Sequence, residues 1–305
     1  MNIGIIGGSG FIGSHIVDKL LAVGHEVTIF DIMAPTRGDV RHIHIDITDL
    51  SKTTVALTGN YDIIYLLAAM ADVNDVFRNP VEAIQVNVMG TANVLEAARR
   101  NKIGRVILAS TVWVYEMAMD EHVTEHTPLS PEKVNHIYTA SKLASELCCY
   151  SYHALYGQQF TILRYGIPYG PRARGGTVAA VFVRKALNGE PITIMGDGSQ
   201  YRNFIYVEDL AEGNVAALKE TAINGTYNLE GLKPVTIKEV AETVKKLVGD
   251  TRIDYQEARA GDYKAKTVSS EKAKTELDWE PKVDFEEGMR RYLQWYQKNV
   301  PKKCN

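Results

Sequence analysis

Residues 2–22 read NIGIIGGSGFIGSHIVDKLLA, and this stretch decides the fold. The apolar run at residues 3–6 is typical of a buried β-strand, and the amphipathic residues after Gly13 indicate an α-helix. Gly7, Gly10 and Gly13 stand at the turn between them. Gly7 permits a tight turn, Gly10 the close approach of a pyrophosphate, and Gly13 the packing of the helix on the strand. The stretch therefore predicts a dinucleotide-binding unit with the wider glycine spacing; an ordinary glycine turn is the plainer alternative.

The first half of the chain continues this alternation of apolar runs and amphipathic stretches. The expected strands are Asn2–Ile6, Glu26–Asp31, Arg41–Ile45, Asp62–Leu67, Arg105–Ser110 and Phe160–Tyr165. The expected helices between them include Gly13–Val23, Pro80–Asn101 and Ile137–Tyr156. The pattern predicts an α/β fold, a doubly wound (Rossmann) parallel sheet with helices on both faces.

The pattern changes after Pro171, where a Gly/Arg-rich stretch begins. We expect the following elements there: Val178–Leu187, Glu208–Lys219, Ile237–Val248 and Phe285–Lys298 as helices, and Ile192–Met195, Phe204–Val207 and Arg252–Gln256 as strands. The run Phe204–Val207 with the helix after it is interpreted as a return to the main sheet. The expected division is a dinucleotide domain at residues 1–166, with a return segment at about 204–229. A smaller, partly interleaved C-terminal substrate lobe takes residues 167–203 and 230–305.

Bulk properties narrow the class of protein. The chain has 305 residues, 45% of them hydrophobic and 23% charged, and a net charge of −3. That charge argues against a broad basic surface for nucleic acid. Cys148, Cys149 and Cys304 are odd in number and lack metal or disulfide spacing, so we expect no metal and a reducing, cytoplasmic setting. No apolar stretch is long enough for a membrane span, and no basic leader precedes the first strand.

Carboxylates follow the second and third expected strands. Asp31 ends the second strand, where it can accept both adenosine ribose hydroxyls and repel a 2′-phosphate, which favours NAD over NADP. A plain strand-terminating Asp is the alternative. Asp46, with Ile47, can reach the adenine amine or cap the helix that starts near Thr48, and both interpretations stay open.

A candidate proton-transfer site lies in mid-chain. Tyr138 and Lys142 are one helical turn apart, so both side chains lie on one face. A tyrosine with a pKa of about 10 is a poor base, and a nearby ammonium together with the nicotinamide ring favours the phenolate. Thr111 follows the fifth strand at the carboxyl edge, where it can orient the reacting alcohol. We expect Thr111, Tyr138 and Lys142 to be catalytic.

Further cofactor contacts are expected around these groups. The amide of Asn87 can brace the cofactor or a bound water, or lie at a helix surface. The remaining expected cofactor residues are Phe11, Ile12, Leu67, Ala68, Ala69, Tyr138, Lys142 and Tyr165.

Motifs along nearly the whole chain carry a family resemblance. They are the glycine loop, Asp31, Asn87 with Gly90-Thr91, Ser110-Thr111 with Val114-Tyr115, Tyr138 with Lys142, Leu163-Arg164 with Tyr169-Gly170-Pro171-Arg172, Arg202 with Phe204–Val207 and Asp209, and Arg259–Asp262. In this order they resemble the extended short-chain dehydrogenase/reductases, in the branch of nucleotide-sugar epimerases and dehydratases. The resemblance implies retained NAD and a transient oxidation, in which Tyr138 takes the proton of the sugar 4-hydroxyl. The 4-keto sugar then rotates and is reduced on its other face. It also implies a homodimer built on helices Pro80–Asn101 and Ile137–Tyr156.

The same resemblance assigns residues to the nucleotide sugar, which we expect to be a UDP-sugar. Arg202 and Arg259 match positions that grip the diphosphate, and Asp262 matches one that holds the ribose. Arg174 stands where UDP-glucuronate 4-epimerases carry an arginine for the sugar carboxylate; a mobile surface arginine is the alternative.

Three departures from the family pattern bear on the reaction. The dehydratases follow the catalytic Thr with an Asp-Glu pair, and the related decarboxylases keep a Glu, but here the positions hold Val112 and Trp113. This difference removes most of the support for a 4,6-dehydratase. Ile167 stands where many relatives place an Asn that contacts phosphate, and Glu116 where a Gly is usual. The leading hypothesis is a nucleotide-sugar 4-epimerase; the alternatives are a net dehydrogenase/reductase, a dehydratase, or an NAD-sensing protein without turnover.

Overall fold

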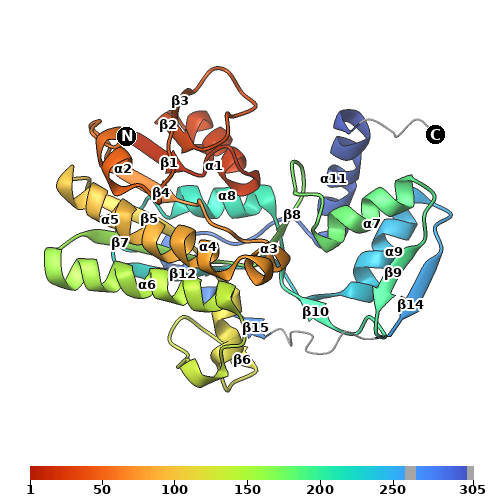
Figure 1. The fold of residues 1–305 in the computed structure, drawn as a ribbon. Coiled ribbons are helices and arrows are strands. Elements are labelled where there is room, and N and C mark those ends of the chain that lie inside the picture. The colour runs from red at the N-terminus through yellow and green to blue at the C-terminus, as the bar shows by residue number, and fades with distance from the viewer. Residues whose placement is uncertain (258–265, 301–305) are drawn as a thin grey trace.

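A computed structural model describes residues 1–257 and 266–300, which form a larger and a smaller lobe (Figure 1). Seven strands build the sheet of the larger lobe: β1 (Asn2–Ile6), β2 (Glu26–Asp31), β3 (Arg41–His44), β4 (Ile63–Leu66), β5 (Arg105–Thr111), β7 (Gln159–Tyr165) and β12 (Gly225–Leu229). They are all parallel, in the order β12-β7-β5-β4-β1-β2-β3. The expected doubly wound sheet is confirmed.

Both faces of this sheet are buried because successive side chains on each strand point to opposite sides. On β1, Ile3 and Ile5 join a core with helices α1 (Phe11–Ala22) and α8 (Val207–Ala216). Ile6 belongs to the opposite core, which includes residues of α5 (Gly90–Arg100) and α6 (Ile137–Tyr156). The continuous apolar character of the strands therefore follows from two covered faces.

Shorter elements complete the larger lobe. They are α2 (Leu50–Ala56), α3 (Val73–Arg78), α4 (Pro80–Ile84), the π-helical turn η1 (Gln85–Met89), the 3₁₀ turns η2 (Val112–Met117), η3 (Pro131–Lys133) and η4 (Glu220–Ala222), α10 (Glu271–Leu277), and the paired strands β6 (His122–Val123) and β15 (Thr267–Val268). The stretch expected to be one helix at Pro80–Asn101 is thus interrupted by a π-helical turn. Within residues 1–257 and 266–300, no helix is both long and apolar enough to cross a membrane.

The smaller lobe has its own apolar core. Its elements are α7 (Val178–Leu187), α9 (Ile237–Val248), α11 (Phe285–Asn299), the parallel pair β9 (Ile192–Met195) and β14 (Ile253–Gln256), and the antiparallel pair β10 (Tyr201–Arg202) and β13 (Val235–Thr236). At its junction with the larger lobe, β8 (Ile167–Tyr169) pairs in parallel with β11 (Phe204–Tyr206). A two-lobed molecule results, as expected.

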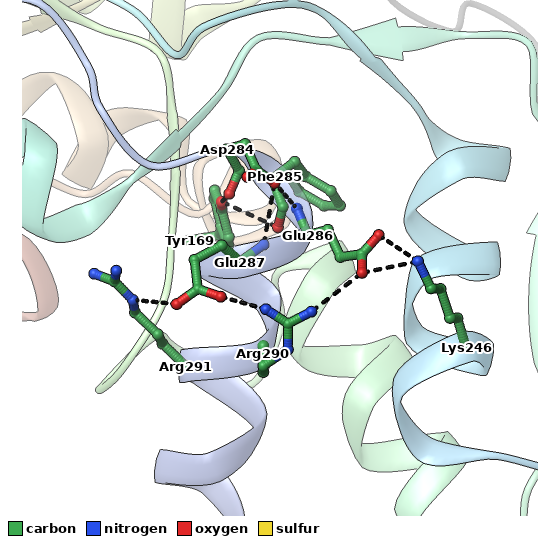
Figure 2. Close-up of polar contacts among 8 residues, drawn as sticks. All are labelled: Tyr169, Lys246, Asp284, Phe285, Glu286, Glu287, Arg290 and Arg291. Atoms are coloured by element: carbon green, nitrogen blue, oxygen red, sulfur yellow. Dashed lines mark hydrogen bonds and ion pairs between the residues drawn. The ribbon is translucent and has the colours of Figure 1, made fainter.

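Charged side chains fix the start of α11 in the smaller lobe (Figure 2). Asp284 caps the helix by accepting from the amides of Glu286 and Glu287, and acidic residues suit this helix end. Glu286 also binds Lys246 of α9 at 2.8 Å, so the two helices are tied across their surface. Arg290 pairs with both glutamates, and being exposed these pairs add little stability each.

Two expectations about chain tracing need correction. The strand at Phe204–Tyr206 pairs with β8 and does not rejoin the main sheet; β12 does so by pairing with β7. The sequence analysis expects no strand at β12, whose short run contains Asn228 and begins with Gly225. The tail also differs, because Ala273, Leu277 and Trp279 pack into the core of the larger lobe although 230–305 were assigned to the smaller one. Elsewhere the expected elements occur, with ends that differ by up to three residues.

Candidate active site

The glycine turn lies between the end of β1 and the first turn of α1. Gly7 has a φ of 88°, and a Cβ there would lie 2.6 Å from the amide nitrogen of Ala68. A Cβ on Gly13 would lie 2.2 Å from the Gly7 carbonyl oxygen. No side chain caps α1, and its first turn holds no acidic residue, so the amides of Phe11 and Ile12 face the position of an anion. The turn therefore has the shape and polarity of a pyrophosphate cradle.

Asp31 lies directly beside this turn. One carboxylate oxygen accepts from the Ser9 amide and the other from the Met33 amide, both at 3.0 Å. Each oxygen keeps a lone pair for a ribose hydroxyl. The end of β2 thus holds an oriented carboxylate at the place that the sequence indicates.

The other carboxylate candidate, Asp46, is exposed and accepts from the Thr48 amide at 2.9 Å and from its hydroxyl at 2.8 Å. The helix cap itself is Asp49, which accepts from the Lys52 amide. The capping interpretation of Asp46 was therefore wrong, and contact with adenine stays a prediction. Ile47 is buried next to it, and its side chain fills the space above Gly90.

The remaining cofactor candidates lie at the carboxyl edges of β4 and β7. Leu67, Ala68 and Ala69 follow β4, and the amides of the first two donate to the Ile6 carbonyl. This places the three residues against the glycine turn. Tyr165 ends β7, and its hydroxyl donates to Asn214 at 2.5 Å, so its phenol is already engaged.

Thr111 and Tyr138 are brought together from two elements. Thr111 is the last residue of β5 and is buried, and its hydroxyl oxygen accepts from the Trp113 amide at 3.2 Å. Tyr138 lies in the first turn of α6 and is half-buried. Burial raises the pKa of Tyr138 to about 12, while a hydrogen bond from Thr111 and the positive charge of Arg174 lower it. The expected phenol–hydroxyl pair is therefore present.

Lys142 lies one turn further along α6 and is buried. Burial lowers the pKa of Lys142 to about 8, while the nearby Glu146 carboxylate raises it. The cation that lowers the pKa of Tyr138 in this structure is Arg174 rather than Lys142. The role expected of Lys142 beside the nicotinamide ring stays a prediction.

A buried ion pair lies behind these groups and was missed in the sequence. Arg164 of β7 binds Glu146 of α6 through two bonds, at 2.7 and 3.0 Å. Ser110 donates to the same carboxylate at 2.5 Å, and Arg164 donates to Tyr115 at 2.9 Å. The bidentate, hydrogen-bonded geometry satisfies both charges inside the protein. The network joins β5, η2, β7 and α6, and so supports the strand and helix that carry Thr111 and Tyr138.

Asn87 joins three segments from within the π-helical turn. Its carbonyl oxygen accepts from the Met70 amide at 2.8 Å, and its amide donates to the Met70 carbonyl at 3.0 Å and to Ser141 at 2.9 Å. Asn87 is buried, so the surface interpretation was wrong. It braces the loop after β4 against α6, while any contact with the cofactor stays a prediction.

The arginine candidates have different surroundings. Arg174 is exposed on the segment after β8, within electrostatic range of Tyr138. Arg172, two residues earlier, has a φ of 65° and donates to Asp18 of α1 at 2.7 Å, which fastens this segment to the larger lobe. Arg202 is half-buried in β10. Arg259 and Asp262 lie outside the described residues.

Trp113 and Glu116 stand at two of the departures noted in the sequence. The Trp113 ring lies edge to face with Tyr138, at 6.1 Å between centroids. The position that holds an acid in dehydratases thus holds an aromatic ring here, and this ring lies beside the Tyr138 phenol. Glu116 is half-buried, burial raises its pKa, and one of its oxygens has no hydrogen-bond partner.

Comparisons with known proteins agree with this geometry. Residues 3–229 match the family model described as "NAD dependent epimerase/dehydratase family". Over 97% of this chain and 96% of the relative's length, the sequence is 31% identical to a UDP-glucuronate 4-epimerase of Thermodesulfobacterium geofontis. It is 33% identical to UDP-glucuronic acid decarboxylase 1 of Xenopus tropicalis, over 99% of this chain and 73% of that protein.

A solved structure is similar over the whole length. It is the UDP-glucose 4-epimerase of Thermotoga maritima with UDP-glucose, at a TM-score of 0.92 and 28% identity, and the match covers 99% of this chain and 100% of the other. The similarity extends over both lobes.

Proposed function

The chain belongs to the NAD-dependent epimerase/dehydratase family, and from that premise we propose that it is a nucleotide-sugar 4-epimerase. Its cofactor is NAD. The site fits this group, because Gly7 and Gly13 allow the tight turn and the close packing of α1 that form the cradle, and Asp31 suits two free ribose hydroxyls. NAD, when bound, accepts a hydride from the sugar and can return it.

The observation that carries the proposal is the Thr111–Tyr138 pair at the carboxyl edge of β5. Thr111 holds the sugar 4-hydroxyl, and Tyr138 removes its proton as the carbon is oxidised and returns the proton when the 4-keto sugar is reduced. Lys142 is buried with a pKa lowered to about 8, and its ammonium form would donate to the nicotinamide ribose. A closed cycle of this kind needs no further acid.

The position of Arg174 favours a hexuronate substrate. Its guanidinium acts on the Tyr138 phenol, so it lies near the place where the sugar would react. A guanidinium is the side chain best suited to bind a carboxylate through two bonds. We propose UDP-glucuronate and its C4 epimer as the favoured pair and a neutral UDP-hexose as the alternative.

Relatives that are decarboxylases make loss of the sugar carboxylate the main competing reaction. The chain has Val112 and Trp113 where the resemblance expects the acids of dehydratases and decarboxylases. Trp113 instead brings its ring to Tyr138. This arrangement favours epimerisation over elimination or decarboxylation.

The deciding experiment incubates the purified protein and NAD with UDP-glucuronate or UDP-glucose and follows the sugars by NMR. We expect the C4 epimer of UDP-glucuronate, with neither released CO₂ nor accumulated NADH. A UDP-pentose with CO₂ would establish a decarboxylase, and stoichiometric NADH at the expense of substrate would establish a dehydrogenase. No conversion across UDP-, dTDP- and GDP-sugars would overturn the proposal.

Tyr138→Phe separates an enzyme from an NAD-sensing protein. The substitution removes the acid–base group, so we expect kcat to fall by about 10²-fold or more while NAD binding persists. Tyr156→Phe, on the exposed end of the same helix, is the matched control. An unchanged kcat in Tyr138→Phe would contradict the assignment of the base.

Several further assignments belong to the same proposal. Arg202, Arg259 and Asp262 hold the nucleotide diphosphate and ribose. The larger lobe binds the cofactor, and the smaller lobe binds the nucleotide of the substrate. The protein acts as a homodimer in a reducing, cytoplasmic compartment, which suits the free thiols of Cys148 and Cys149.

A further inference from the structure

Glu230 is a buried acid that the reaction does not use. It directly follows β12 and is 3% exposed. Both carboxyl oxygens are inaccessible to solvent, and neither has a hydrogen-bond partner among residues 1–257 and 266–300. An orphaned polar group of this kind is rare in folded proteins and calls for an explanation.

The carboxyl group lies beside segments through which the chain passes from one lobe to the other. The first passage is Gly166, which separates β7 from β8; a Cβ there would lie 2.5 Å from Glu230 Oε2 and 2.9 Å from the Asn203 carbonyl oxygen. Asn203, between β10 and β11, belongs to the second passage. The third passage is formed by Glu230 itself and Gly231, which touches the Phe204 carbonyl.

Hydrogen bonds between backbone segments join these passages. The Ile167 amide donates to the Asn203 carbonyl at 2.7 Å, and the Gly166 amide donates to the Leu229 carbonyl at 2.9 Å. The Asn203 side chain also donates to the Lys266 carbonyl at 2.8 Å. Glu230 is therefore enclosed by the segments whose contacts set how one lobe sits on the other.

Cations of the described segments near Glu230 are paired with other acids. Arg164 is bound to Glu146, and Lys266 to Glu121 at 3.5 Å. The nearby Glu125 is bound to the Asn228 amide at 2.7 Å. Burial raises the pKa of Glu230, and the adjacent Gly231 backbone lowers it by a smaller amount.

We propose that Glu230 is a positioning residue: its neutral carboxyl permits the lobes to pack at these passages, and its ionisation separates them. An ionised carboxylate without a partner is unfavourable in a dry site, so it favours arrangements that admit water between the passages. Separation changes the spacing of Thr111 and Arg202, which lie on different lobes. The inference does not rest on the proposed function.

The size of the effect follows from proton linkage. If the packed arrangement requires the proton and the separated one does not, the ratio of packed to separated molecules falls by at most about tenfold per pH unit above the pKa of Glu230. Below that pKa the ratio is constant. An isosteric neutral side chain removes the dependence.

The test compares the full chain with Glu230→Gln at about pH 6 and about pH 9, on either side of neutrality. An infrared difference spectrum at neutral pH should show a neutral carboxyl band in the wild type that is absent from Glu230→Gln. Hydrogen exchange at the Gly166 and Ile167 amides should be equal in both proteins at the lower pH. At the higher pH it should be faster in the wild type, by up to about tenfold per pH unit above the pKa.

Three further variants complete the experiment. Glu125→Gln removes a partnered carboxyl next to the same strand and should exchange like the wild type, whereas Glu230→Asp should keep the pH response. Glu230→Met replaces Glu230→Gln if the latter does not fold. Identical exchange in wild type and the neutral variants at both pH values, or no neutral carboxyl band, would overturn the inference.

Discussion

At the residue scale, the reactivity of Tyr138 is determined by groups from other elements. Burial of the phenol opposes its ionisation. Thr111, at the end of β5, and Arg174, on the segment after β8, favour ionisation. The phenol therefore cannot be assessed from its helix alone. The spacing to Lys142 identifies the helix face, but the contacts that shift the pKa of Tyr138 come from the fold.

The substitution Thr111→Val tests whether Thr111 lowers the pKa of Tyr138, with the pH dependence of kcat/KM as the measurement. Removing a hydrogen bond that stabilises the phenolate raises the pKa of Tyr138, so the rising alkaline limb of kcat/KM should move to higher pH. At a pH on that limb, the rate falls by about tenfold for each unit by which the pKa rises. Steady-state rates measured across the pH range give the limb directly.

Arginine variants provide the control for this prediction. Arg174→Gln should move the limb in the same direction because it removes a cation near the phenol. Arg184→Gln, on the exposed side of α7, should leave it in place. A limb that moves to lower pH in Thr111→Val would show that another group titrates.

At the element scale, helix α6 is held in place by polar contacts on its buried face. Asn87 reaches it from the π-helical turn, and Arg164 reaches it from β7 through Glu146. Turns of the π type frequently occur at functional sites, and this one directs Asn87 inward. The position of Tyr138 thus depends on elements on both sides of α6.

Asn87→Ala should loosen this arrangement. The substitution leaves the Met70 amide and carbonyl without their buried partner, so we expect the free energy of unfolding to fall by about 2–3 kcal/mol. Urea unfolding measures the loss, and hydrogen exchange at Met70 locates it. Asn74→Ala, on the exposed side of α3, should change the stability little. Equal stability of the two variants would mean that the bonds of Asn87 are replaced by water.

Much of this arrangement could be predicted from the sequence. The parts that could not be predicted, β12 and the Arg164–Glu146 pair, depend on contacts between distant residues. Apolar runs predicted six strands of the main sheet, β1 to β5 and β7. Glycine spacing and Asp31 predicted the position of the pyrophosphate cradle. β12 was missed because Asn228 and the glycine at its start weaken the apolar pattern. The Arg164–Glu146 pair was missed because each residue, taken alone, reads as a surface charge. Only their packing on neighbouring elements makes them partners.

At the scale of the whole molecule, the lobes are interleaved because the chain passes between them several times. β12 returns to the sheet only after the chain has built α7, β9 and β10 in the smaller lobe. Local patterning cannot specify such a return, because any apolar strand satisfies the pairing at the edge of β7. Each passage also requires small or polar residues at the junction, as Gly166 and Glu230 illustrate.

The surface of the larger lobe carries two neighbouring apolar stripes. Phe77 and Val81, on α3 and α4, are 83% and 71% exposed, and Leu147 on α6 is 55% exposed. α4 leads through η1 into α5, and both lie alongside α6 on one face of the lobe (Figure 1). Exposed apolar patches of this kind typically mark protein interfaces. A second copy presenting the same stripes across a two-fold axis would cover both.

Leu147→Glu tests the expected homodimer. Sedimentation velocity should give a dimer for the wild type and a monomer for the variant, because the substitution places a charge in an interface that excludes water. Val55→Glu, on the exposed side of α2, makes the same change away from the stripes and should leave the dimer intact. A wild-type protein that sediments as a monomer would rule out this assembly. Both variants should retain the Thr111–Tyr138 pair within each subunit, so activity that persists in a monomeric Leu147→Glu would mean that each subunit contains a complete site.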